Sequence, residues 1–142
     1  MMIAEFVAVV IIAYLLGSIP FGLIIGKLKK GVDIRQQGSG KTGATNLMRV
    51  AGTKLGVLAL VLDVVKATGA VMLATVIIGR DSGVLPIAGV SVYWQHIAQV
   101  AAGLAAVVGH NWPIFAKFKG GRGVTAYLGT VFAIFPPAGI FG

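Results

Sequence analysis

The chain has 142 residues, of which 57% are hydrophobic and only 11% are charged, and its mean hydropathy is +0.94. A soluble domain needs about a quarter charged residues to keep its surface hydrated, so this composition indicates a membrane protein. The formal net charge of +8 favours anionic partners, and the absence of cysteine excludes disulfides, thiolate nucleophiles and cysteine-based metal sites.

The first long apolar segment covers residues 3–26 and predicts a membrane-spanning helix. A stretch of about 20 apolar residues, at about 1.5 Å each, crosses a hydrocarbon core of about 30 Å. The segment differs from a secretory signal peptide, because Glu5 replaces the usual basic flank and no A-x-A cleavage site follows. We expect Pro20 to kink this helix near its exit from the membrane.

Three more apolar segments, 55–79, 84–108 and 124–142, are long enough to span. Polar residues near Tyr93 make the third the weakest of them. The fourth stops at the end of the chain without a polar flank, which suggests a C-terminally incomplete protein. The predicted fold is all-α, a polytopic transmembrane helix bundle forming one membrane domain over residues 1–142. Small residues that predict close helix packing are Gly69, Ala70, Gly103, Ala105 and Ala106.

The two loops between these segments that carry most of the charge are 27–54 and 109–123. The first holds seven Lys and Arg residues against Asp33, and the second holds three and no acid. Cytoplasmic loops collect basic residues, and four spanning helices would place both loops on one side. We therefore expect an outside N-terminus and a site that faces the cytoplasm.

Both loops are also rich in glycine. Successive glycines allow backbone N–H groups to turn toward one point and hold phosphate or carboxylate oxygens. Arg122 precedes the predicted fourth helix, whose N-terminus would favour an anion at the same place. The simpler interpretation is that the glycines form turns and the basic residues bind lipid headgroups. Two such loops on one face favour a shared anion site. The glycines are Gly38, Gly40, Gly43, Gly120, Gly121 and Gly123.

The segment 38–42, GSGKT, resembles the end of a nucleotide-binding P-loop, but the rest of the motif is missing. The motif requires glycine where this chain has Arg35, and it requires a buried strand directly before the loop. Residues 33–37 are polar instead. A nucleotide-hydrolysing domain is therefore not expected.

Four segments together resemble the bacterial acyl-phosphate-dependent glycerol-3-phosphate acyltransferases. They are AYLLGSIPFG (13–22), GSGKTGATN with the following Arg49, LDVVKA (62–67) and GHNWPIFAKFKGGRG (109–123). The resemblance implies a bacterial inner-membrane enzyme of phospholipid synthesis with about seven spanning helices in full-length members. It would move an acyl group from acyl phosphate to the 1-hydroxyl of glycerol 3-phosphate, giving lysophosphatidic acid and phosphate. The chain departs from the family in lacking a third motif with His and Asn, and in having Arg122 where Lys is common.

The resemblance also implies roles for residues of both loops. No Ser-His-Asp set is evident, and acyl phosphate is already activated, so no acyl-enzyme is needed. The general base stays open between a His of the missing motif and the substrate's own phosphate. The implied catalytic residues are Ser39, Thr45, Asn46 and His110. The implied substrate-binding residues are Gly38, Gly40, Arg49, Lys66, Gly120, Gly121, Arg122 and Gly123.

Two of these residues have alternative interpretations. Asp63 and Lys66 lie three positions apart on one helix face, so they form either an internal ion pair or a pair from which Lys66 reaches the active site. His110 either donates to phosphate or caps the third helix.

No cofactor and no metal ion is expected. The expected partners are glycerol 3-phosphate, acyl phosphate and membrane lipids, and not nucleic acid. A transporter for an organic phosphate or another small anion is the alternative function, although no inverted repeat supports it. A non-catalytic scaffold would leave both loops unexplained.

Overall fold

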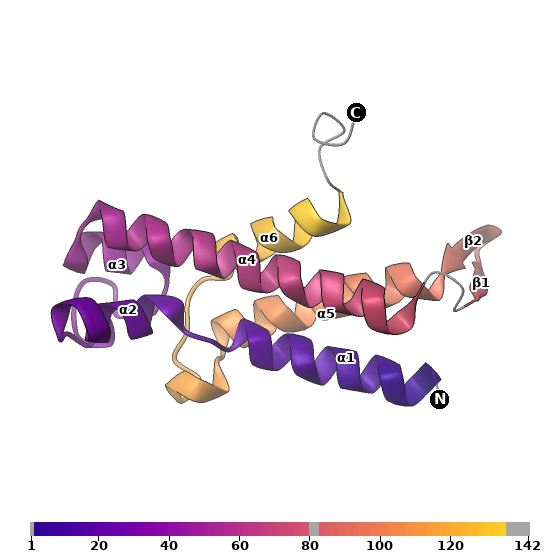
Figure 1. Ribbon diagram of the computed structural model, residues 1–142, viewed down its shortest axis with the longest axis horizontal. Helices are drawn as coiled ribbons and strands as arrows, with labels where there is room; N and C mark the ends of the chain where they lie inside the picture. The colour runs from indigo at the N-terminus through magenta and orange to yellow at the C-terminus, as the bar shows by residue number, and fades with distance from the viewer. Residues whose placement is uncertain (1, 80–82, 136–142) are drawn as a thin grey trace.

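The computed structural model describes residues 2–79 and 83–135 of the chain. The molecule is an elongated helical bundle in which α1, α4 and α5 run along the long axis (Figure 1). The end with α2 and α3 lies opposite the end with the N-terminus and a small β-hairpin. The elements are α1 (Met2–Gly17), α2 (Phe21–Lys30), η1 (Ile34–Gln36), α3 (Ala44–Ala51), α4 (Thr53–Ile78), β1 (Val84–Ile87), β2 (Val90–Tyr93), α5 (Trp94–Asn111), η2 (Ile114–Ala116) and α6 (Val124–Ile134).

The first apolar segment is broken into α1 and α2 near Pro20. Proline has no backbone N–H and disfavours helical geometry in the residue before it, so regular helix stops at Gly17 and resumes at Phe21. The predicted kink is confirmed, but it is a complete break. The carbonyl of Ile19, freed by the break, accepts a hydrogen bond from Lys66 Nζ at 2.7 Å.

Helical structure extends into the predicted loop 27–54. The helix α2 continues to Lys30. The next residue, Gly31, caps it with a φ of +66°, which lets its N–H donate to carbonyls of the last turn. The short helix α3 then buries Leu47 on one face and exposes Arg49 on the other. This loop is therefore a folded cap at one end of the bundle. Its many charged residues gave no indication of this helical structure.

The third predicted segment, 84–108, is wrong over its first ten residues. They form an antiparallel hairpin in which Val84 pairs with Tyr93 and Ile87 pairs with Val90. The turn is Ala88-Gly89, with φ values of +50° and +81°, as a two-residue hairpin of matching twist requires. The helix α5 starts only at Trp94. The other elements of the described residues are helices, so the all-α prediction is corrected only at this hairpin, where branched residues on both sides of a glycine turn favour strands.

The long helices pack through small residues. A Cβ added at Gly17 of α1 would overlap the backbone of Ala106 on α5, so these two helices approach at backbone distance. Gly103 of α5 similarly accommodates Thr130 of α6. The predicted packing is confirmed for Ala70, Gly103 and Ala106. It is wrong for Gly69, where a Cβ would meet nothing within 4 Å.

Two helical stretches in the described residues are long and apolar enough to cross a membrane, Ile3–Lys30 and Thr53–Ile78. The helix α6 is apolar but shorter, and residues 136–142 of the predicted fourth segment lie outside the described residues. Large apolar side chains such as Val65, Met72 and Val76 are exposed on α4. Such a surface suits lipid or further helices better than water.

Candidate active site

The two glycine-rich loops meet at one end of the bundle. The backbone N–H of Thr42 donates to the carbonyl of Gly120 at 3.4 Å, which joins the loops directly. In Figure 1 the chain runs from η2 to α6 past the inner ends of α2 and α3. A cavity of about 290 Å³ lies where the loops meet. Its lining residues are Ser39, Lys41, Gly43, Ala44, Thr45, Asn46, Arg49, Leu60, His110, Gly121, Arg122, Gly123, Val124, Thr125 and Leu128.

Two helix N-termini open on this cavity. The helix α3 begins after Gly43 and α6 begins after Gly123, and neither N-cap residue forms a side-chain cap. Gly123 has a φ of +77°, which glycine adopts without strain. The first residues of both helices, including Thr45 and Thr125, line the cavity. Uncapped N–H groups and two helix dipoles therefore favour an anion here.

The charged side chains of the cavity are basic. Lys41 and Arg49 come from the first loop and Arg122 from the second, and all three are exposed. None of the described lining residues is acidic. Guanidinium groups suit phosphate oxygens, because their planar fork donates two parallel hydrogen bonds. The charge of the site thus matches the anion site that the sequence predicted.

Asn46, predicted as catalytic, uses its side chain to hold the first loop. Its Oδ1 accepts from the N–H of Ser39 at 2.8 Å, and its Nδ2 donates to the carbonyls of Ile34 and Lys41 at 2.7 and 2.9 Å. A third carbonyl, that of Gln37, lies 3.1 Å from the same nitrogen. These contacts satisfy both ends of the buried amide. In this structure Asn46 therefore fixes the shape of residues 34–41.

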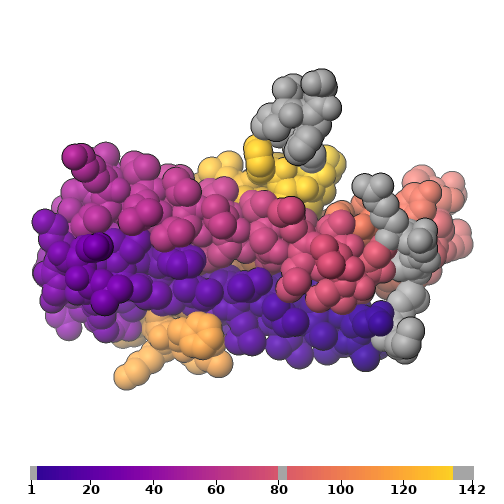
Figure 2. All heavy atoms as spheres, viewed as in Figure 1, coloured from indigo at the N-terminus to yellow at the C-terminus, as the bar shows by residue number. Residues whose placement is uncertain are grey.

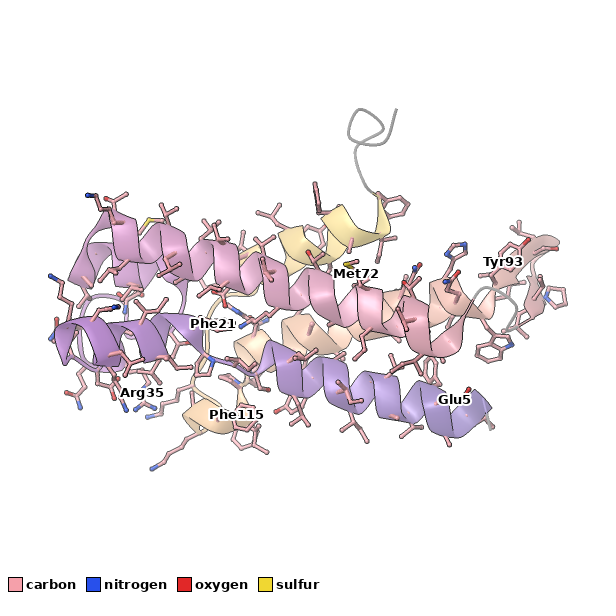
Figure 3. All side chains as sticks on the ribbon, in the orientation of Figure 1. Glu5, Phe21, Arg35, Met72, Tyr93 and Phe115 are labelled. Atoms are coloured by element: carbon pink, nitrogen blue, oxygen red, sulfur yellow. The ribbon has the colours of Figure 1, made fainter. Side chains whose placement is uncertain are left out.

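A second tether lies on the outer side of the first loop. The Arg35 guanidinium donates to Asp33 at 2.6 Å and approaches the carbonyl of Ala116 at 3.5 Å. Figure 3 places Arg35 on the side where Phe115 of η2 projects. The hydrogen bond from Arg35 lowers the pKa of Asp33 to about 2, so the carboxylate stays ionised at physiological pH.

There is no room for a side chain at Gly120 or Gly121. A Cβ at Gly121 would overlap His110 Nε2, and a Cβ at Gly120 would overlap the backbone carbonyls of His110 and Asn111. The N–H of Gly121 also donates to the His110 carbonyl at 3.0 Å. The second loop therefore folds tightly over the end of α5. The His110 side chain, buried apart from its cavity face, lies against this loop.

Asp63 and Lys66 form the internal ion pair, which was one of the two interpretations of their spacing. Lys66 Nζ lies 2.8 Å from Asp63 Oδ1 and also donates to the carbonyl of Ile19. The ammonium lies 5.6 Å from the ring centre of Phe21, which Figure 3 shows between α2 and α4. Lys66 is not among the cavity-lining residues.

The structure brings most of the predicted residues to the cavity, and four of them do not line it. Those at the cavity are Ser39, Thr45, Asn46, Arg49, His110, Gly121, Arg122 and Gly123. Those not among its lining residues are Gly38, Gly40, Lys66 and Gly120. The prediction missed Lys41 and Thr125, although Lys41 lies within the GSGKTG run and Thr125 follows a glycine at a predicted helix start. The apolar residues Leu60, Val124 and Leu128 gave no signal in the sequence.

Comparison with known sequences gives consistent matches. The family model for glycerol-3-phosphate acyltransferase matches residues 7–142. Glycerol-3-phosphate acyltransferase 3 of Dehalococcoides mccartyi is 49% identical over 142 residues, which are 100% of this chain and 64% of that protein. The glycerol-3-phosphate acyltransferase of Aquifex aeolicus is 47% identical over 132 residues, which are 93% of this chain and 61% of that protein.

Solved structures agree with these matches. The crystal structure of PlsY, an integral membrane glycerol 3-phosphate acyltransferase, in its glycerol 3-phosphate form matches with a TM-score of 0.74 and 45% identity, covering 92% of this chain and 58% of that one. Its lysophosphatidic acid form matches with a TM-score of 0.71 and 44% identity, covering 92% and 57%. The chain thus spans between 57% and 64% of these proteins. It belongs to the glycerol-3-phosphate acyltransferase family.

Proposed function

We propose that the protein transfers a fatty acyl group from acyl phosphate to the 1-hydroxyl of glycerol 3-phosphate in a bacterial inner membrane. The observation that carries this proposal is the cavity where two uncapped helix N-termini and the basic residues Lys41, Arg49 and Arg122 converge. Both substrates carry a phosphate group, and this arrangement suits two phosphates held close together. The two matching crystal structures of PlsY are described as its glycerol 3-phosphate form and its lysophosphatidic acid form.

The reaction needs little covalent chemistry from the protein. The substrate hydroxyl oxygen attacks the acyl carbonyl carbon, the bond from that carbon to the phosphate oxygen breaks, and phosphate leaves. The hydroxyl proton leaves with it, to the departing phosphate or to a side chain. Positioning and stabilisation of the developing negative charge are then the main tasks of the protein. Arg49 on the first loop and Arg122 on the second suit the glycerol phosphate and the acyl phosphate respectively.

The cavity also has an apolar side. Leu60 of α4 and Val124 and Leu128 of α6 are among its lining residues. We assign this side to the first carbons of the acyl chain, because an alkyl chain loses free energy when it leaves water. The names of the relatives favour acyl transfer over the anion transport that the sequence left open.

The proposal is tested by phosphate release from acyl phosphate by the purified protein in detergent. We expect release only when glycerol 3-phosphate is present, and in the absence of nucleotide and of added metal ions. The matched control replaces glycerol 3-phosphate with glycerol, which keeps the hydroxyl and lacks the phosphate. A requirement for ATP, or for acyl-CoA in place of acyl phosphate, would contradict the proposal.

A further inference from the structure

Three ionisable side chains form a buried cluster that reaches the cavity through His110. Asp63 and Lys66 lie on α4, and His110 lies near the end of α5. Only 1%, 7% and 6% of their respective surfaces is exposed, so water screens them little. Asp63 Oδ1 lies 2.8 Å from Lys66 Nζ and 3.6 Å from His110 Nδ1. The carboxylate therefore lies between the lysine and the histidine.

The carboxylate of Asp63 is short of hydrogen bonds. Apart from the ion pair with Lys66, neither of its oxygens receives a hydrogen bond within the described part of the chain. An ionised carboxylate offers about four acceptor positions, and leaving them empty in a buried site is costly. The other side-chain nitrogen within ion-pair distance is His110 Nδ1. A shift of a few tenths of an ångström would make this contact a hydrogen bond, and such contacts commonly tighten when substrate binds.

The opposite nitrogen of the same ring faces the site. Gly121 and Gly43 lie beside His110 Nε2, where a Cβ at Gly121 would overlap that nitrogen, and His110 lines the cavity. The partner of one ring nitrogen determines which nitrogen carries the proton and how the ring is oriented. A carboxylate at Nδ1 thus leaves Nε2 directed toward the anion-binding loops.

We propose that Asp63 is a positioning residue that holds the Nδ1–H of His110 and balances the charge of the ring when Nε2 also carries a proton, so that Nε2–H donates to the phosphate group bound in the cavity. Lys66 neutralises the carboxylate and fixes it to the α1–α2 break through the carbonyl of Ile19. This inference deepens the proposed function, since the phosphate in the cavity would be that of a substrate. It assigns the Asp63–Lys66 pair a task beyond holding helices together.

The test uses ¹⁵N-histidine spectra of the chain in lipid nanodiscs. The chain has two histidines, so His96→Gln leaves His110 as the single signal. We expect Nδ1 to carry a proton with and without phosphate, and Nε2 to carry one as the donor when inorganic phosphate is bound. The double variant Asp63→Leu with Lys66→Met removes the acceptor and its cation together, a replacement that buried ion pairs often tolerate. It should leave the ring with a single proton in the presence of phosphate, and so replace a charge-assisted hydrogen bond by a neutral one and weaken the phosphate response about tenfold.

The matched control is Thr68→Val, which removes the hydrogen bond from Thr68 Oγ1 on α4 to the carbonyl of Gly129 on α6 and leaves the cluster intact. It should preserve both the protonation of the ring and the phosphate response. Two results would overturn the inference: an Nε2 without a proton in the phosphate-bound parent, for which no variant is needed, or an unchanged ring protonation and phosphate response in the double variant. Neither readout depends on acyl transfer, so a failure of the proposed function would be seen separately.

Discussion

At the residue scale, His110 shows how the site depends on what surrounds a functional side chain. The ring fits because position 121 carries no side chain, and its Nδ1 lies 3.6 Å from Asp63 Oδ1. The carboxylate is in turn compensated by Lys66. Each of these side chains has a neighbour that leaves room for it or compensates its charge, which is typical of a pre-organised polar site.

The two cavity arginines are expected to differ in their kinetic roles. Arg49→Ala should chiefly raise the apparent KM for glycerol 3-phosphate, whereas Arg122→Ala should lose most activity and Arg122→Lys should retain most of it. Each lost charge-assisted contact is expected to cost about 1.5 to 3 kcal/mol, or about ten- to a hundredfold in the relevant constant. Steady-state kinetics with each substrate varied in turn would measure these effects.

Lys54→Ala is the matched control for these arginine variants, because Lys54 is an exposed cation of the first loop that does not line the cavity. It should leave both constants near their parent values. Full activity of Arg122→Ala in correctly inserted protein would return the second loop to the role of a lipid-headgroup anchor.

At the scale of elements, the site is built by helix starts. The helices α3 and α6 both begin after a glycine at the cavity edge, and the loop before α3 is fixed by the side chain of Asn46. An amide that bonds to several backbone groups at once gives a loop a single shape. The position of the α3 N-terminus therefore depends on a side chain within α3 itself.

Loss of the Asn46 amide should release this loop. In Asn46→Ala the carbonyls of residues 34, 37 and 41 lose the amide donor, although the first two keep a backbone N–H donor, and the N–H of Ser39 loses its acceptor, at a cost of about 1 to 3 kcal/mol. Backbone N–H groups of residues 34–41 should exchange with deuterium markedly faster than in the parent, as mass spectrometry would show. Gln36→Ala, an exposed change in the same loop, should not alter exchange. Unchanged protection in Asn46→Ala would show that other contacts hold the loop.

The elements that the sequence predicted well are those that depend on local chemistry. Pro20 marked the break between α1 and α2, and Gly123 marked the start of α6. The hairpin 84–93 was missed because a run of apolar residues reads the same whether it is a helix or a strand. The turn signal in Ala88-Gly89 carries the difference.

The parts of the candidate site in which glycine and basic residues cluster could be predicted from the sequence. The parts in which tertiary contacts determine what a side chain binds could not. The sequence grouped Arg49 with Arg122, and both line the cavity. It could not tell that the Asn46 amide would be used by the backbone, or that Lys66 would be held by Asp63 and Ile19. These outcomes depend on which atoms lie within hydrogen-bond distance after folding, and chain spacing alone does not determine that.

At the scale of the whole molecule, the bundle has two unlike ends. The basic, glycine-rich loops gather at the end with α2 and α3, while Glu5 and Tyr93 lie toward the other end (Figure 3). Figure 2 shows the elongated shape, with the η2 segment projecting from one side. We propose that the basic end faces the cytoplasm, as the distribution of Lys and Arg favours.

Cysteine labelling tests this orientation. Single cysteines at Gln37 and Phe118, both exposed, should react with an impermeant maleimide only from the cytoplasmic side. A cysteine at Ser82, which lies outside the described residues, should react only from the other side. Inverted vesicles provide the control for access. Labelling of positions 37 and 118 from opposite sides would contradict the shared site altogether.

The most direct measurement of the central claim, that both loops form one anion-binding cavity, is protection of their arginines from chemical modification. The purified protein is treated with phenylglyoxal, with and without inorganic phosphate or glycerol 3-phosphate, and modification of each arginine is quantified by mass spectrometry. Both ligands should protect Arg49 and Arg122 together at the same concentration, and leave Arg80, which lies outside the described residues, unprotected. Protection of only one of the two arginines, or equal protection of Arg80, would contradict a single cavity shared by the two loops.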